Sequence, residues 1–206
     1  MAPYARAVDW ERLFDDLEDQ LASGWEAERA ALDAESERLR FSRLDLRARL
    51  GALVRASTPV AATLHDGTTV AGRPCAVGAD WAALVPDDGR VNVLLPLDAV
   101  SLWTLDHGAL LGSGANAEPL SPLRERLSLG FVLRDLARRR TGVTVRTRPG
   151  TLLSGTIDRA GADHLDLALH DAGEARRARA VRGFRIIPFA ALLSVTAAAS
   201  SERPFG

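Results

Sequence analysis

Hydrophobic and polar residues alternate in short runs from about residue 60 onward, which is typical of β-strands. In residues 165–169 the three leucines fall on one face. Val143 and Val145 likewise share a face, opposite Thr144. Segments containing glycine separate these runs, so the pattern predicts many short antiparallel strands joined by tight turns.

The strand pattern occurs twice. Residues 60–85 align without a gap with residues 143–168, and 8 of the 26 aligned positions are identical, the turn glycines among them. Residues 96–100 match 188–192 at a larger offset, so the second copy holds nine extra residues, expected in a loop. Each copy is preceded by a helix-like segment and predicts five strands, which favours a small β-barrel led by a helix.

An amphipathic helix is predicted at the N-terminus, with Trp10, Phe14 and Leu17 on one apolar face and acidic residues around it. This face either packs on the chain's own barrels, the reading that we favour, or docks on a protein partner or a second copy. Alternation from Leu84 places Trp81 on the outer face of its strand, where it either covers a neighbouring strand or the N-terminal helix, or marks an interface between the barrels or with a partner. We favour an internal contact for Trp81 as well.

The predicted fold is therefore mainly β with α: two small Sm-like or SH3-like barrels in tandem, each preceded by a helix, behind a helical arm. The expected parts are an acidic amphipathic arm (residues 1–41), a first helix-plus-barrel unit (42–105) and a Gly-rich linker (106–121). A second, basic helix-plus-barrel unit (122–196) and a disordered tail (197–206) are expected to follow.

Some of these residues resemble a known family. Asp66-Gly67 followed by Gly72 and Asp80 resembles the first signature of Sm-like proteins, and residues 181–183 resemble the second. The whole chain also resembles an uncharacterised actinobacterial family with two such units, a resemblance that implies no activity. Sm-like proteins bind RNA as rings of small barrels. Leu84 and Leu167 stand where that family has an RNA-contacting Asn, so the resemblance implies the fold more strongly than RNA binding.

Charge is strongly segregated along the chain. Residues 1–37 carry 3 Arg against 11 acids, a net charge of −8, whereas residues 123–206 carry 15 Arg against 8 acids, a net charge of +7. All 26 basic residues are arginine, which we attribute to a GC-rich genome rather than to function. The segregation nevertheless indicates an acidic arm and a basic second unit.

A basic patch for RNA or DNA backbone is the leading hypothesis for the second unit. The triplet 138–140 ends a helix, where cations are favourable without any ligand. Phe131, Phe184 and Phe189 are expected in the core, which leaves no aromatic for base stacking. The candidate nucleic-acid contacts are Arg138, Arg139, Arg140, Arg146, Arg148, Arg176, Arg177, Arg179, Arg182 and Arg185.

No catalytic or metal signature is present in the sequence. His164 and His170 lie too far apart on one strand to share an ion, and Cys75 is expected to be packed rather than nucleophilic. The chain lacks signal-peptide and membrane-spanning features, so a cytoplasmic protein is expected. Because no catalytic or metal signature is present, we expect neither enzyme activity nor a cofactor. The leading hypothesis is a nucleic-acid-associated module with the acidic arm as competitor. The alternative is a protein-interaction or oligomerisation scaffold whose strand edges pair with another subunit.

Overall fold

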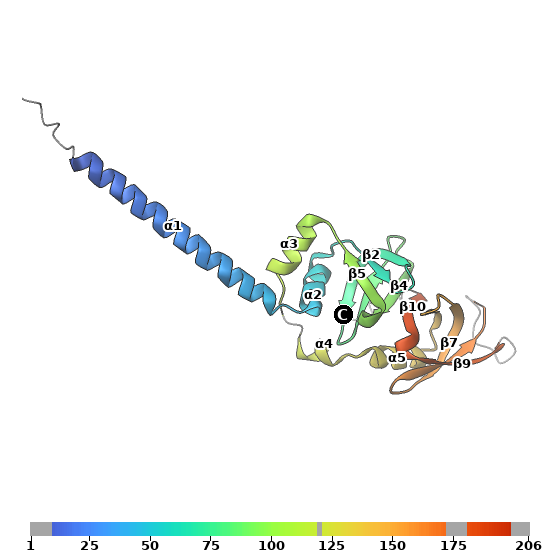
Figure 1. Ribbon diagram of the computed structural model, residues 1–206. Coiled ribbons are helices and arrows are strands. Elements are labelled where there is room, and N and C mark those ends of the chain that lie inside the picture. The colour runs from blue at the N-terminus through green and yellow to red at the C-terminus, as the bar shows by residue number, and fades with distance from the viewer. Residues whose placement is uncertain (1–9, 119–120, 172–180, 199–206) are drawn as a thin grey trace, which may run out of the picture. The chain divides into compact units, whose positions relative to one another are not determined.

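The computed structural model describes residues 10–118, 121–171 and 181–198 (Figure 1). The chain divides into two compact units, residues 1–44 and residues 45–206, and each is described by itself.

The first unit consists of one continuous helix, α1, which runs for 33 residues from Trp10 to Ser42. The helix passes through Gly24 without a break, although glycine costs about 1 kcal/mol relative to alanine in a helix. Pairs one turn apart, such as Glu37 with Arg40 at 2.7 Å, lie on its polar surface. Its large apolar side chains are exposed: Phe14, Leu17, Leu21, Trp25, Leu32, Leu39 and Phe41.

The second unit holds the two repeats, which follow the predicted order of a helix and five strands. The first repeat comprises α2 (Leu46–Ala56), β1 (Val60–Leu64), β2 (Thr69–Val77), β3 (Trp81–Val85), β4 (Val91–Pro96) and β5 (Val100–Thr104). The connection contains α3 (His107–Ala115) and α4 (Pro122–Arg126). The second repeat comprises α5 (Leu129–Arg138), β6 (Gly142–Thr147), β7 (Leu152–Ala160), β8 (His164–Leu169), β9 (Gly183–Pro188) and β10 (Leu192–Ala198).

The prediction of two closed barrels is wrong. All ten strands form one open antiparallel sheet in the order β5-β1-β2-β3-β4-β10-β6-β7-β8-β9. In each repeat the fifth strand pairs with the first, but the fourth strand does not pair with the fifth of its own repeat. Instead β4 pairs with β10, so the first repeat continues directly into the second, and the fold is mainly β with α.

Two hydrophobic cores lie on this sheet. Leu50 and Leu53 of α2 contribute to the core over the first repeat, and Val132 and Leu133 of α5 contribute to the core over the second. The predicted inward leucines Leu165 and Leu167 and the valines Val143 and Val145 are buried in the second core, which confirms these faces. The repeated turn glycines Gly67 and Gly150 both adopt a φ of +81°, a conformation that L side chains rarely adopt.

Helix boundaries differ from the sequence expectation at three places. The first unit is expected to begin at residue 42, but helix α2 begins at Leu46, where the Asp45 carboxylate caps it by accepting the Ala48 amide. The segment expected to be a Gly-rich linker, residues 106–121, contains α3. The second unit, expected to begin with a single helix at residue 122, has two: α4 ends at Arg126, and α5 follows with its own Ser128 cap.

Candidate functional site

The junction between the repeats is the largest contact that the sequence did not predict. Strands β4 and β10 pair in antiparallel register, with Leu94 opposite Val195 and Val93 opposite Thr196. Leu94 of the first repeat is buried in the second core, and Leu193 of the second repeat is buried in the first core. The two repeats therefore share side chains across the junction, and neither core is complete without the other repeat.

A turn of the first repeat also holds the helix of the second. The Asp80 carboxylate accepts the backbone N–H of Leu129 at 2.6 Å, at the first residue of α5. The Leu127 carbonyl accepts the Ala79 N–H at 3.0 Å and the Trp81 indole N–H at 2.8 Å. A carboxylate is favourable at a helix N-terminus because it meets unpaired N–H groups and the positive end of the dipole. The Gly-Ala-Asp turn thus fixes where α5 begins.

Trp81 does not lie on an outer surface. Its side chain is 1% exposed and packs in the second core together with Ala83, whereas Ala82 and Leu84 face the first core. Strand β3 is therefore buried on both faces, which a period of two in the sequence cannot reveal. Trp81 therefore lies at an interface between the two repeats, one of the contacts that the sequence analysis considers, and its side chain is not open to a partner.

Two ion pairs cross the same junction. Arg146 of β6 donates to the Asp66 carboxylate at 3.2 Å, and Arg148 lies 3.8 Å from Asp98. The Asp66 side chain is only 10% exposed and also accepts the Thr68 N–H. Burial disfavours the charged carboxylate, but the hydrogen bonds from Thr68 and Arg146 outweigh it and hold the pKa of Asp66 below its ordinary value.

The predicted basic patch is largely engaged within the chain. Arg138 and Arg139 share Asp135, whose pKa their hydrogen bonds lower against the opposing effect of burial. The other described arginines have partners in the chain as well: Arg140 pairs with Asp158, Arg146 with Asp66, Arg148 with Asp98 and Arg182 with Asp171. Arg185 donates to a backbone carbonyl. Arg176, Arg177 and Arg179 lie outside the described residues.

The predicted interface residues of the arm fall on α1. Phe14 and Leu17 are exposed, and Trp10 is the first residue of the helix, with its side chain outside the described set. Phe131 and Phe184, which the sequence analysis expects in the core, are both more than half exposed. Phe189 is partly buried against the second core, as expected.

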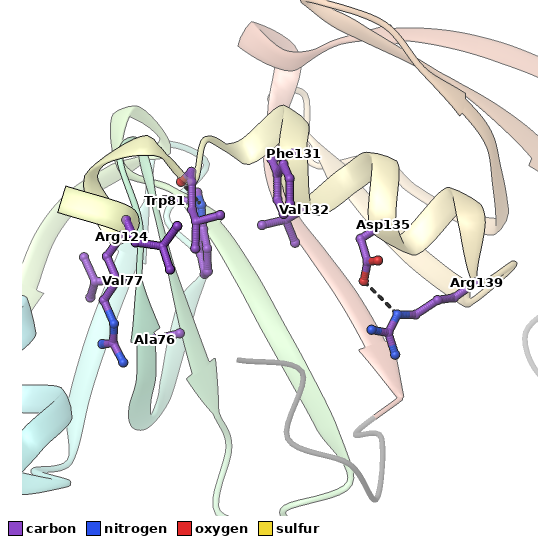
Figure 2. Close-up of a pocket in the computed structure, with 10 residues that line it drawn as sticks. Ala76, Val77, Trp81, Arg124, Phe131, Val132, Asp135 and Arg139 are labelled. Carbon is purple, nitrogen blue, oxygen red and sulfur yellow. Dashed lines mark hydrogen bonds and ion pairs between the residues drawn. The ribbon is translucent and has the colours of Figure 1, made fainter. Parts of the chain in front are cut away.

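A hollow of about 310 Å³ lies between the first repeat and the connection to α5 (Figure 2). Ala76, Val77 and Trp81 form one wall, and Phe131 and Val132 lie on the other. Asp135 stands at the rim in an ion pair with Arg139, so the lining carries no acid available as a catalytic group. We assign no reaction to this hollow.

Titratable side chains elsewhere are paired or isolated. His170 is buried and its ring contacts the Thr156 hydroxyl at 2.8 Å. Cys75 is exposed as a residue, but its Sγ is partly buried and donates to the Ala83 carbonyl at 3.5 Å. This partial desolvation raises the pKa of the thiol, which disfavours the nucleophilic thiolate. Among the residues that the structure describes, no group of three or more His, Cys, Asp or Glu side chains is placed to hold a metal ion. Within the same residues, no helix is both long and apolar enough to span a bilayer.

The two ends of the sheet are the remaining candidate site. Strand β9 has Ile186 74% exposed together with exposed Phe184, and strand β5 has exposed Leu102. Among the residues that the structure describes, β9 pairs only with β8 and β5 only with β1. An edge strand presents a row of backbone donors and acceptors, and apolar side chains on it favour pairing with another chain. By the repeat, these two edge strands correspond to the two strands that pair with each other at the junction. The repeat that shows this correspondence is already visible in the sequence.

In comparisons with known proteins, no family model matches the chain, and neither a curated protein nor a solved structure matches it.

Removing the Asp80 carboxylate is expected to destabilise the junction. Asp80→Ala leaves the Leu129 N–H without its acceptor and should lower the free energy of unfolding by about 1–2 kcal/mol. Asp163 occupies the same place in the second turn with an exposed side chain, so Asp163→Ala should cost less than about 0.5 kcal/mol. Denaturant unfolding measures both values. Equal costs for the two variants would remove the capping role that we assign to Asp80.

The Asp66 ion pair predicts a pH-dependent stability. The pKa of Asp66 is lowered by folding from about 3.9, so its contribution is present above about pH 4 and is lost as the pH falls through the folded value. Asp66→Asn should therefore destabilise the protein at neutral pH, and the difference from wild type should shrink on acidification. Asp98→Asn, at a longer and more exposed pair, should cost less than about 1 kcal/mol. Unfolding measured at several pH values tests this prediction. A loss of stability on Asp66→Asn that does not change with pH would contradict the assignment.

Proposed function

We propose that the chain is a non-catalytic protein-interaction scaffold that associates with further copies of itself. The open sheet carries this proposal, because within residues 10–118, 121–171 and 181–198 its two end strands, β5 and β9, have one partner each, while their counterparts in the other repeat have two. Backbone pairing at an exposed edge gives affinity without a large apolar surface.

The arginines support a scaffold over a phosphate-binding surface. Six of the seven described members of the predicted patch lie in ion pairs within the chain: Arg138, Arg139, Arg140, Arg146, Arg148 and Arg182. A phosphate backbone would have to displace the carboxylates from these pairs. Arg146 and Arg148 pair across the junction, which gives them a structural role that needs no ligand.

Helix α1 supports the same class of function through a different surface. It exposes large apolar side chains, such as Trp25 and Leu32, along most of its length. The helix also holds ten acidic residues against four arginines, so two parallel copies of it would repel each other. A protein partner with an apolar, basic surface fits α1 better than a second α1 does.

Mass in solution tests the scaffold proposal. Full-length protein is studied by sedimentation velocity and multi-angle light scattering from low micromolar concentration to the highest soluble concentration. The expected result is a mass that rises above that of one chain, because edge pairing is reversible and follows mass action. A mass of one chain at every concentration would overturn the proposal.

Nucleic-acid binding stays the competing hypothesis, and two observations favour it: the net charge of +7 over residues 123–206 and the exposed Phe184, which offers a ring for stacking. Anisotropy of labelled single-stranded RNA and duplex DNA at two salt concentrations separates the two functions. The scaffold proposal predicts no salt-sensitive binding. Salt-sensitive binding that Arg182→Ala together with Arg185→Ala weakens would place nucleic acid ahead of self-association.

A further inference from the structure

The repeat places the two free edges of the sheet in known relation to the two strands paired at its centre. Residue numbers of the fourth and fifth strands differ by 92 between the repeats, which maps β4 onto β9 and β5 onto β10. The match extends to an irregularity in the strand: one residue bulges in each fifth strand, Ser101 in β5 and Leu193 in β10. The free edges are thus equivalent in backbone form to the joined ones.

We propose that copies of this chain join head to tail, with β9 of one copy pairing antiparallel with β5 of the next in the register that β4 and β10 already use. This inference rests on the proposed self-association and names its geometry. The observed pairs Leu94 with Val195 and Val93 with Thr196 transfer to Ile186 with Trp103 and Arg185 with Thr104. Ile186, the most exposed apolar side chain of β9, then meets an aromatic cross-strand partner.

The second Gly-Ala-Asp turn carries the carboxylate that this arrangement requires, which in the single chain pairs only with the neighbouring His164 among the described residues. In the first repeat Asp80 accepts the amide of Leu129, and the equivalent pair between copies is Asp163 with the amide of Leu46. The Asp163 side chain is exposed, and Leu46 is 46% exposed whereas Leu129 is 4% exposed. Both members of the pair are therefore at the surface, at opposite ends of the sheet.

The contact between copies is weaker than the junction within the chain. Trp81, Ala83 and Leu94 of the junction are apolar and buried. Their counterparts at the free end are His164, Asp166 and Ile186, of which only Ile186 is apolar. Less apolar surface leaves water on association, so we expect reversible assembly at micromolar or higher concentration. The contact joins two different edges, so it is heterologous and yields a closed ring or an open chain, never an isologous dimer.

A substitution at the edge tests which surface carries the association. Ile186→Arg places a charge in the proposed contact without touching either core, and it should raise the dissociation constant at least about tenfold. Leu123→Arg is the matched control, because Leu123 is similarly exposed but belongs to α4, away from both edges. Sedimentation of full-length variants gives both constants. Equal constants for Ile186→Arg and wild type would overturn the head-to-tail contact.

Cysteine cross-linking tests the direction and register. In full-length protein with Cys75→Ala, Thr104→Cys and Arg185→Cys are made as separate variants, mixed and oxidised. The proposal predicts a disulfide-linked dimer in the mixture and none in either variant alone, because residue 104 meets only residue 185. Val93→Cys with Thr196→Cys in one chain is the geometric control, since those residues already face each other.

Failure of this inference is distinct from failure of the scaffold proposal. Cross-linking of Arg185→Cys with itself would show an isologous contact and overturn the head-to-tail arrangement while self-association stands. An oligomer by mass whose mixed variants do not cross-link would do the same. A single-chain mass at every concentration would overturn both proposals together.

Discussion

Trp81→Ala is expected to lower the free energy of unfolding by about 3–5 kcal/mol, the range for emptying a buried aromatic site. The side chain is 1% exposed in the core that both repeats build, so its removal opens a cavity at the junction. The same change removes the donor to the Leu127 carbonyl. Denaturant unfolding of the purified variant gives the value. If the free energy of unfolding depends on denaturant concentration with the same slope as in wild type, the two transitions are comparable.

Two variants separate the components of the Trp81 effect. Trp81→Phe keeps most of the buried ring but loses the indole donor. Because the Leu127 carbonyl still accepts the Ala79 N–H, we expect a loss of only about 1 kcal/mol in the free energy of unfolding. His164→Ala changes the equivalent position of the second repeat, which is partly exposed, and should cost less than Trp81→Phe. Comparable losses for Trp81→Ala and His164→Ala would contradict a junction held by Trp81.

Gly155→Ala is expected to cost about 1–3 kcal/mol, toward the upper end, because the new methyl group has no space. A Cβ at Gly155 would overlap the Ala168 carbonyl oxygen of β8, which is backbone and cannot rotate away. Gly72 has the same relation to the Val85 carbonyl in the first repeat, so Gly72→Ala should show a similar loss. Both glycines let the backbone of the neighbouring strand approach closely.

Gly142→Ala is the matched control for these two changes. Gly142 also lies in a strand of the sheet, but an added Cβ would meet nothing within 4 Å. Its expected effect is within about 0.5 kcal/mol of zero. Thermal and denaturant unfolding of the three variants tests the comparison. A Gly142→Ala loss as large as that of Gly155→Ala would show that the close approach of a neighbouring strand does not explain the cost.

The internal repeat made most of the local structure predictable. Identical turn residues at a fixed offset located the hairpins, and Gly67 and Gly150 do adopt the same left-handed conformation. The alternation of Leu165 and Leu167 identified an inward face, and both side chains are buried. These features depend on neighbours close in sequence, which is why one sequence suffices to predict them.

The junction was not predictable in the same way. Pairing of β4 with β10 joins segments about 100 residues apart, and a strand edge consists of backbone groups that carry no sequence signature. Alternation assigned Trp81 to an outer face correctly relative to the first core, but it could not show that a second core covers that face. The difference between Trp81 and its counterpart His164 was the available signal, because it makes one outer face apolar and the other polar.

Most described arginines of the predicted basic patch lie in ion pairs within the chain, and the sequence could not show this for a related reason. The net charge of a segment does not show where its counterions lie, and the acids that pair with Arg146 and Arg148 come from the first repeat. A count over residues 123–206 omits those partners. Charge segregation along the sequence therefore overstated the charge available to a ligand.

Hydrogen exchange of the strand amides as a function of protein concentration tests most directly whether the sheet continues from repeat to repeat and from copy to copy. We predict that β4 and β10 are protected at every concentration, because they already pair with each other. In β5 and β9, the amides that point away from their partner strands β1 and β8 should exchange rapidly in dilute protein and become protected together as the concentration rises. Exchange of β5 and β9 that is independent of concentration would contradict assembly through the edges. Rapid exchange of β4 and β10 would contradict the continuous sheet itself.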